Sequence, residues 1–147
     1  PGDPDALAAW FAALEDHPLL GVCFDTCHVW AAGHDLVTPG GTAATLDLLE
    51  ATVGPGRLGL VHANDSLDGC GSKRDRHTTI GEGALGIAPF AELLAHPSVA
   101  GVPVVVETPS EKDGVAWAGH AADIKLLNSL IPEPPVVTHG FRGDARS

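Results

Sequence analysis

Apolar residues recur along the chain at spacings that change from helical to strand-like and back. The first 16 residues carry the i, i+3, i+4, i+7 spacing of a helix face, formed by Leu7, Trp10, Phe11 and Leu14. Asp3 can cap this helix, Pro4 suits its first turn, and Pro18 closes it. We therefore predict an N-terminal helix with one apolar face.

Short apolar runs separate the helical segments. Residues 20–24, 58–61 and 102–106 are almost continuously apolar, which is typical of strands in a parallel sheet that is buried on both faces. Each run is closed by a polar residue, in order Asp25, His62 and Glu107. We therefore predict strands that end at these positions.

Further helices are predicted between and after these strands. Residues 42–53 and 115–130 have helical spacing, and Pro89 begins a short helix that ends at His96 and Pro97. In the last helix we expect an inward-facing side that is made up of Trp117, Ala121, Ile124 and either Leu126 or Leu127.

The predicted order α-β-α-β-α-β-α indicates the fold class. Continuously apolar strands that alternate with amphipathic helices favour a parallel α/β sheet, and right-handed crossovers place the C-terminal ends of all strands at one edge. Three strands are too few for a closed barrel but suit about half of a (β/α)₈ TIM barrel; a small open α/β sheet is the alternative. A glycine-rich loop over residues 64–86 interrupts the alternation, and residues 133–147 are expected to form an irregular tail.

Composition fits one compact globular domain. The 147 residues are 44% hydrophobic and 18% charged, and no apolar run approaches the roughly 18 residues of a membrane span. The N-terminus lacks the basic and apolar regions of a signal peptide. The odd set of Cys23, Cys27 and Cys70 argues against a disulfide framework and is typical of thiols in a reducing compartment. We therefore expect a cytoplasmic location and no membrane partner.

The charge distribution matters more than its sum. A formal net charge of −11 argues against nucleic-acid binding when taken alone, because contacts to phosphate need lysine and arginine. However, three of the eight basic residues fall within four positions, namely Lys73, Arg74 and Arg76. Several acidic residues occupy places that suit metal ligands, where bound cations would offset their charge.

The three strand ends carry side chains that can bind a metal ion. Asp25, His62 and Glu107 each close a predicted strand, and active sites of parallel α/β folds lie at this edge of the sheet. Each residue also has a structural interpretation: Asp25 could cap a helix, and His62 could be a core histidine. A structural role for Glu107 is harder to defend, because an unpaired buried carboxylate is costly.

Two short motifs add further candidate ligands. Asp25 and His28 form D-T-C-H after the first strand, and Asp75 and His77 form D-R-H in the long loop. Carboxylate oxygen and neutral imidazole nitrogen are common zinc ligands. In an extended D-R-H segment, the first and third side chains point to the same side, so both can face one ion. Exposed loop histidines remain the alternative for His28 and His77.

The basic cluster in the same loop could hold a phosphodiester beside the metal ions. The loop mixes glycines with potential donors, namely Ser72, Lys73, Arg74 and Arg76. A solvated charged loop is the alternative interpretation.

Four sequence blocks resemble, in order, the signature blocks of the endonuclease IV family of zinc-dependent AP endonucleases. They are G-V-C-F-D-T-C-H-V-W-A-A-G-H-D-L (21–36), V-H-A-N-D-S (61–66), G-S-K-R-D-R-H-T-T-I-G-E-G-A-L-G (71–86) and V-V-V-E-T-P (104–109). The resemblance spans about residues 5–130. It implies a TIM barrel, of which residues 1–132 would form the C-terminal half.

The resemblance also implies a site with three zinc ions. Asp25, His62 and Glu107 would be ligands of one Zn²⁺, and a second Zn²⁺ would be held by His28, Asp75 and His77. Two histidines and a bridging glutamate of the family's complete site have no match in residues 1–147. Glu107 and Asp25 would be the catalytic residues, with Glu107 closest to a general base.

The implied activity is hydrolysis of the DNA phosphodiester on the 5′ side of abasic sites in base excision repair. The implied partner is double-stranded DNA that contains abasic sites, bound by a protein that is a monomer when full length. Two alternatives stay open at this point. One is a TIM-barrel sugar isomerase or epimerase with a single divalent metal ion, and the other is a truncated, non-catalytic metal-binding domain.

Overall fold

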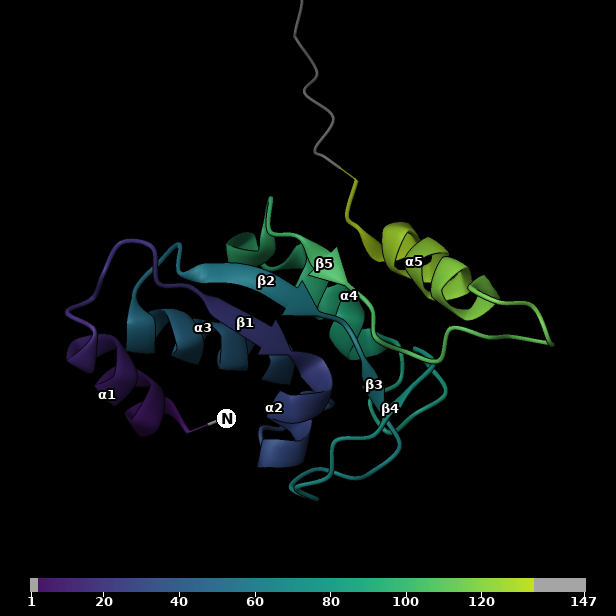
Figure 1. Ribbon diagram of the computed structural model, residues 1–147, viewed down its shortest axis with the longest axis horizontal. Helices are drawn as coiled ribbons and strands as arrows, with labels where there is room; N and C mark the ends of the chain where they lie inside the picture. Colours follow the sequence, from purple (N-terminus) through teal and green to yellow (C-terminus); the bar gives the residue numbers. More distant parts are fainter. Residues whose placement is uncertain (1–2, 134–147) are drawn as a thin grey trace, which may run out of the picture.

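The computed structural model describes residues 3–133. Figure 1 shows three parallel strands with helices beside them, and a long loop region that extends from the ends of the strands. The predicted tail over residues 133–147 lies, except for its first residue, outside the described residues. No helix in the described part of the chain is long and apolar enough to cross a membrane.

The sheet has the strand order β1-β2-β5, and both pairings are parallel. β1 (Val22–Asp25) and β2 (Leu58–His62) match the predicted strands at their C-terminal ends, whereas β5 (Val104–Val105) is shorter than predicted. Asp25 stands opposite His62 in the register of β1 and β2. The three parallel strands therefore end level with one another at one edge of the sheet.

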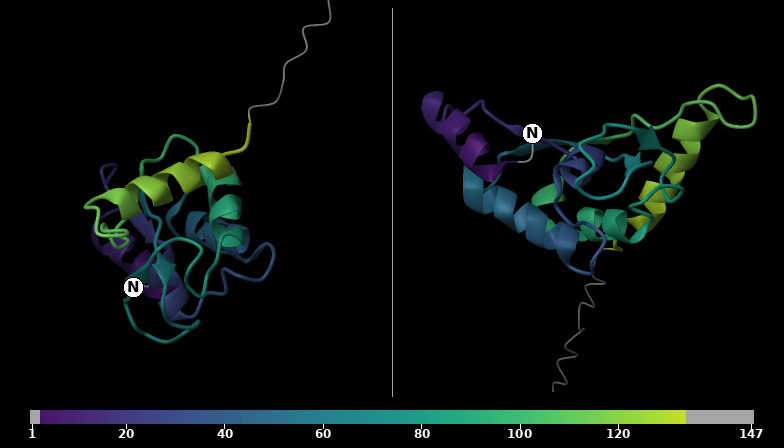
Figure 2. Two further views of the ribbon diagram at one scale, coloured as in Figure 1. Left: turned by 90° about the vertical axis from the view of Figure 1, so that its right-hand side faces the viewer. Right: turned by 90° about the horizontal axis from the view of Figure 1, so that it is seen from below.

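The helices lie along one face of the sheet. The helical series comprises α1 (Pro4–Ala13), α3 (Gly41–Val53), α4 (Ala88–Ala95) and α5 (Ala118–Leu130). Figure 2 shows them from below as an arc beside the strands, and successive members of this series are in contact. A short 3₁₀ helix, η1 (Pro97–Val99), follows α4.

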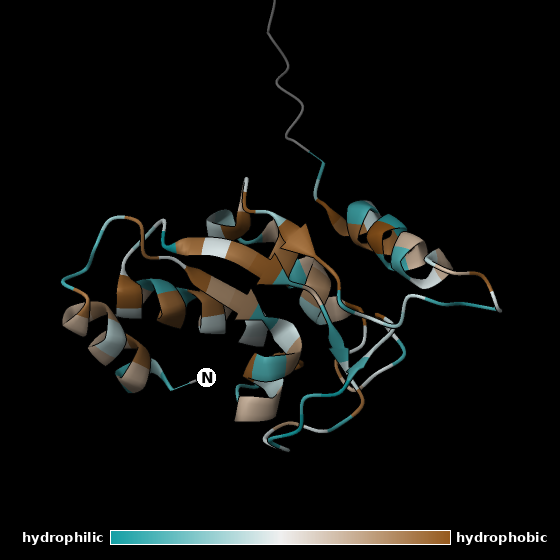
Figure 3. Cartoon of the chain, viewed as in Figure 1, coloured by the Kyte–Doolittle hydropathy of each residue, from teal (hydrophilic) through white to brown (hydrophobic). Residues whose placement is uncertain are grey.

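The core fills the space between this helical arc and the sheet. Fully buried members include Leu46 from α3, Val61 from β2, and Phe90 and Leu93 from α4. Figure 3 shows the apolar colouring that runs along β1, β2 and β5 and the hydrophilic colouring of β3. The apolar strands thus anchor the sheet, and polar residues gather beyond the strand ends.

The sheet is not buried on both faces within the described residues, which corrects the sequence-based expectation. Cys23 in β1 is exposed, and the side chain of Val105 in β5 is 40% exposed. The helices cover only one face, as they do on the outside of a (β/α)₈ barrel, whose opposite sheet face forms the barrel interior.

The apolar face predicted for the first helix is only partly buried. Phe11 is 6% exposed, but Trp10 is 68% exposed and Leu14 is 49% exposed. Asp3 caps the helix as predicted, because its side chain accepts a hydrogen bond from the Asp5 backbone N–H. α1 contacts α3 beside the edge strand β1, so its remaining apolar surface has little to pack against.

The inward-facing side predicted for the last helix is wrong in part. Trp117 is 70% exposed and precedes the helix in a left-handed conformation, and Ile124 is 50% exposed. The buried side instead comprises Gly119, Asp123 and Leu127. Asp123 determines this orientation, because its carboxylate accepts hydrogen bonds from the Thr108 hydroxyl and the Ile80 backbone N–H.

Two elements beyond the strand ends were not predicted. α2 (Thr26–Ala32) begins directly after β1. A small antiparallel hairpin pairs β3 (Asp65–Ser66) with β4 (His77–Thr78) inside the predicted glycine-rich loop. Both elements carry candidate ligands, so they matter for the site.

Candidate metal centre

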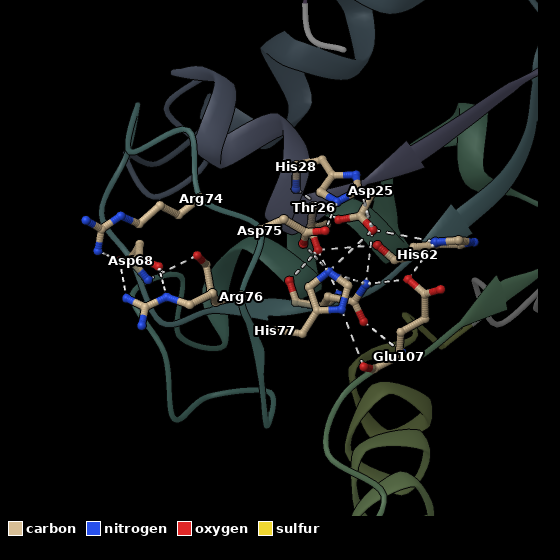
Figure 4. A network of polar contacts seen from close by, with 12 residues as sticks. Asp25, Thr26, His28, His62, Asp68, Arg74, Asp75, Arg76, His77 and Glu107 are labelled. Carbon is tan, nitrogen blue, oxygen red and sulfur yellow. Dashed lines mark hydrogen bonds and ion pairs between the residues drawn. The ribbon is translucent and has the colours of Figure 1, made fainter.

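The three residues that close the predicted strands meet at one point. The Nδ1 atom of His62 lies 2.9 Å from Oε2 of Glu107 and 3.5 Å from Oδ2 of Asp25. Figure 4 shows the three side chains pointing toward one another from the ends of neighbouring strands. The side chain of Asp25 is 6% exposed and that of Glu107 is 47% exposed, so the group runs from the interior to the surface.

The second predicted group assembles beside the first. The Asp75 carboxylate lies between two imidazoles, with Oδ2 2.8 Å from Nε2 of His28 and Oδ1 2.9 Å from Nε2 of His77. Oδ2 of Asp25 is 3.9 Å from Nδ1 of His28 and 3.9 Å from Nε2 of His77. Asp25 therefore lies at the junction of the two groups, and all six candidate ligands form one cluster.

α2 positions His28 one turn after the end of β1. Oδ1 of Asp25 accepts a hydrogen bond of 3.0 Å from the His28 backbone N–H, which caps the helix at its first turn. The capping interpretation of Asp25 and its place in the cluster therefore both hold. Gly33 ends α2 in the left-handed conformation that glycine adopts at low cost.

The β3–β4 hairpin brings the D-R-H motif back to the strand ends. Ser66 pairs with His77, which places the second half of the loop alongside the first. Backbone bonds then attach the loop to α2, from Gly71 N–H to the Trp30 carbonyl and from Lys73 N–H to the Ala31 carbonyl, both 3.0 Å. These contacts hold Asp75 next to His28.

Asp65 organises the loop that follows β4. It is fully buried, and its carboxylate accepts five backbone hydrogen bonds of 2.7–3.2 Å, from Ser66, Gly81, Gly83, Leu85 and Gly86. A Cβ atom added at Gly83 would lie 2.4 Å from Oδ1 of Asp65, so this close approach requires glycine. The loop is therefore folded around a buried anion.

Sequence reasoning missed Asn64 as a site residue. This fully buried side chain lies between the two groups and contacts the carboxylates of Asp25 and Glu107. The available signal was its place two residues after His62 in V-H-A-N-D-S, where three consecutive polar residues follow a strand end. All three, Asn64, Asp65 and Ser66, are fully buried.

The carboxylates favour the charged form of the His28 imidazole. Burial disfavours the charged form of His28, but the hydrogen bond to Asp75 and the charges of Asp25, Asp75 and Glu107 outweigh it and raise the pKa of the His28 imidazole. The hydrogen bond from His28 in turn lowers the pKa of the Asp75 carboxyl below its ordinary value. Three carboxylates close together thus create a site that favours positive charge.

The donor set fits divalent metal ions. Three groups of residues each bring three possible ligand atoms within 4.8 Å of one another. They are Asp25 with His28 and His77, Asp25 with His62 and Glu107, and Cys27 with Asp75 and His77. Carboxylate oxygens and imidazole nitrogens are the mixed O/N ligands that zinc accepts in catalytic sites. A cation would also offset the negative charge of the clustered carboxylates.

The four candidate phosphate-binding residues do not gather around the cluster as a group. Arg76 makes a bidentate contact with Asp68, and Nη1 of Arg74 lies 3.6 Å from the same carboxylate. Figure 4 shows Arg74, Arg76 and Asp68 together on the far side of Asp75 from Glu107. The Ser72 hydroxyl accepts a hydrogen bond from the Arg74 backbone N–H.

Lys73 lines a hollow beside two of the candidate ligands. An open hollow of about 480 Å³ is lined by Lys73 and Arg74 together with His28 and Asp75. Lys73 makes no ion pair with a carboxylate within the described residues 3–133. Its ammonium is therefore available to an anion that approaches His28 and Asp75.

Comparisons with known proteins identify the relatives of this chain. Residues 1–130 match the model of the family described as xylose isomerase-like TIM barrel. A probable endonuclease 4 of Streptomyces avermitilis is 54% identical over 121 residues, which are 82% of this chain and 37% of that protein. A probable endonuclease 4 of Streptomyces coelicolor is 55% identical over 121 residues, which are 82% of this chain and 40% of that protein.

A solved structure shows the same arrangement. The crystal structure of endonuclease IV from Thermus thermophilus superposes with a TM-score of 0.72 at 30% sequence identity, covering 88% of this chain and 44% of that one. The chain thus spans about two fifths of the length of the curated relatives that it matches.

Proposed function

Because the chain belongs to the xylose isomerase-like TIM barrel family, we propose that it carries part of the active site of a zinc-dependent AP endonuclease. The names of its curated relatives support a nuclease within this family. In this proposal residues 1–132 form the C-terminal half of the barrel. The activity belongs to the complete protein, because the chain spans about two fifths of its relatives.

One observation carries the proposal: six side chains from separate segments of the chain form two adjoining O/N clusters at the C-terminal ends of the strands. Asp25, His62 and Glu107 would hold one ion, and a second would be held by His28, Asp75 and His77. A protein that needs one metal ion has no use for the second cluster. This distinction favours the nuclease over a sugar isomerase or epimerase.

Asp25 and Glu107 would have different roles, because one is buried and the other is half exposed. Bound zinc ions supply Lewis acidity, which activates water at neutral pH and stabilises negative charge on a reacting phosphate. Asp25 is buried and held by two N–H donors, so it is suited to fix the geometry of the cluster. Glu107 is half exposed at the rim, where its carboxylate can accept a proton from water.

The substrate in this proposal is duplex DNA with an abasic site. Phosphate contacts position a duplex without reading its sequence, which suits an enzyme that recognises a missing base. The lysine beside the cluster, Lys73, is the side chain best placed for such a contact. In this proposal Arg74 and Arg76 take a secondary role, because Asp68 already neutralises part of their charge.

We expect Lys73→Gln in the complete protein to weaken binding of abasic-site duplex several-fold and to reduce the salt slope of log K by about 1, because one phosphate contact is lost. Fluorescence anisotropy at several salt concentrations measures both quantities. Lys125→Gln, on the exposed side of α5, serves as the control. An unchanged slope for Lys73→Gln would show that Lys73 makes no phosphate contact.

Incision of a duplex with one abasic site tests the proposed function. The complete protein should cut on the 5′ side of the lesion and leave a 3′-hydroxyl end. It should stop cutting after chelation and recover when zinc is restored. Incision that persists without metal would contradict the proposal. A single bound metal ion together with epimerisation of a sugar would support the isomerase instead.

A further inference from the structure

Asn64 connects the ends of all three parallel strands. It follows β2, and its side-chain Nδ2 lies 3.1 Å from Oδ2 of Asp25 and 3.2 Å from Oε2 of Glu107. Its Oδ1 accepts a hydrogen bond of 2.8 Å from the Glu107 backbone N–H. One fully buried amide therefore contacts Glu107, two positions after β5, twice and Asp25, which ends β1, once. A longer approach of 3.5 Å separates Nδ2 from Nε2 of His77 in the second group.

One backbone hydrogen bond fixes the orientation of this amide. Since Oδ1 receives the Glu107 N–H, the NH₂ group must face the two carboxylates, where both of its hydrogens find acceptors. The reversed amide would place its oxygen against two carboxylates and would leave the Glu107 N–H without an acceptor. The amide is thus the matched partner for two acids that repel each other.

Two hydrogen bonds with the Thr26 side chain fix the backbone of Asn64. The Thr26 hydroxyl donates to the Asn64 carbonyl at 2.6 Å and accepts from the Asn64 N–H at 2.9 Å. Thr26 is the first residue of α2, so these two hydrogen bonds connect Asn64 to the helix turn that Asp25 caps. The side chain therefore has little freedom to move away from the carboxylates.

An uncharged donor at this place suits a cation site. A lysine in the same position would also satisfy two carboxylates, but its charge would compete with the bound ion. An amide uses one lone pair of each carboxylate oxygen and leaves the others for a ligand bond. Residues that hold metal ligands in this way typically contribute a factor of about 10–100 to metal affinity.

We propose that Asn64 is a positioning residue, which holds Asp25 and Glu107 at the spacing that lets them bind one zinc ion together with His62. The inference rests on the proposed function, because it takes these three residues as ligands. It adds a residue that contacts the ligands and does not itself bind the ion. The amide sets the shape of the ligand pair before the ion arrives.

Zinc affinity of the complete protein tests this role, measured by competition with a chromophoric chelator and by the number of ions retained. Asn64→Ala and Asn64→Leu both remove the donors, and the leucine keeps most of the side-chain volume. For each variant that folds, we expect one ion to bind about 10–100-fold more weakly, while the other ions change by less than about threefold.

Thr108→Val separates positioning from general stability. Thr108 is buried next to Glu107 but bonds to Asp123 and not to the cluster. Its loss should lower the melting temperature of the metal-free protein and leave zinc affinity within about threefold, because no contact to a proposed ligand is removed.

The outcomes distinguish this inference from the proposed function. Wild-type protein that binds no zinc would contradict both. Wild-type protein that binds zinc, with Asn64→Ala equally tight, would overturn the positioning role and leave the proposed function intact. Equal losses of zinc affinity in Thr108→Val and Asn64→Ala would also overturn it, because the effect would then follow stability alone.

Discussion

Replacing Glu107 with glutamine is expected to lower abasic-site incision by the complete protein about 10³-fold, or about 4 kcal/mol of transition-state stabilisation. Glutamine keeps the shape of the side chain but removes its charge and its ability to accept a proton from water. The backbone bond from Glu107 N–H to Asn64 would persist. Single-turnover incision with saturating enzyme measures this effect on the chemical step.

Glu111→Gln provides the matched control for this prediction. Glu111 lies four positions further along the same connection after β5, and it is exposed. Among the described residues, Glu111 belongs to none of the groups of candidate metal ligands. Incision should therefore stay within about twofold of wild type, as is usual for surface substitutions. A Glu107→Gln enzyme that cuts at the wild-type rate would remove Glu107 from the mechanism.

Replacing Asp65 with asparagine is expected to destabilise the protein by about 3 kcal/mol or more. The Asp65 carboxylate accepts five backbone hydrogen bonds, two at Oδ1 and three at Oδ2. Whichever way an asparagine amide turns, its NH₂ group faces at least two N–H donors, and each buried donor without an acceptor costs about 1–3 kcal/mol. Thermal unfolding of the metal-free protein measures the loss.

The neighbouring carboxylate of Glu82 supplies the comparison. Glu82 lies within the loop that Asp65 organises, but its side chain is exposed. Glu82→Gln should change stability by less than about 0.5 kcal/mol. If Asp65→Asn unfolded at the same temperature as Glu82→Gln, the five hydrogen bonds would not hold the loop.

The strand ends could be predicted from the sequence because a run of apolar residues is followed there by a single polar residue. Each apolar run ends at a residue that no buried strand would accept without a partner, and parallel connectivity then places Asp25, His62 and Glu107 side by side. The prediction needed no knowledge of side-chain packing. The structure places these three residues within contact of one another.

The connecting elements could not be predicted in this way. α2 is only seven residues long, so its helical spacing is too short to recognise. The sequence offers helix capping only as one of two alternatives for Asp25. β3 and β4 have two residues each, and their pairing depends on contacts between distant segments. The sequence therefore indicates only a glycine-rich loop, whereas two short segments within it pair as a hairpin.

The burial of certain polar residues was the main property that could not be predicted from the sequence. Asn64 and Asp65 look like ordinary loop residues, but the first lies between two carboxylates and the second is surrounded by backbone N–H groups. Conversely, Trp117 was expected inside because it is apolar, whereas Asp123 takes the buried side of that helix. Hydrogen-bond partners decide these cases, and a single sequence does not display them.

The most direct test of the account is a crystal structure of the complete protein grown with zinc, with anomalous diffraction recorded at the zinc absorption edge. We expect one anomalous peak within bonding distance of Asp25, His62 and Glu107, and another within bonding distance of His28, Asp75 and His77. Peaks located elsewhere, or no zinc peak between these side chains, would contradict the claim that the six residues form a metal centre.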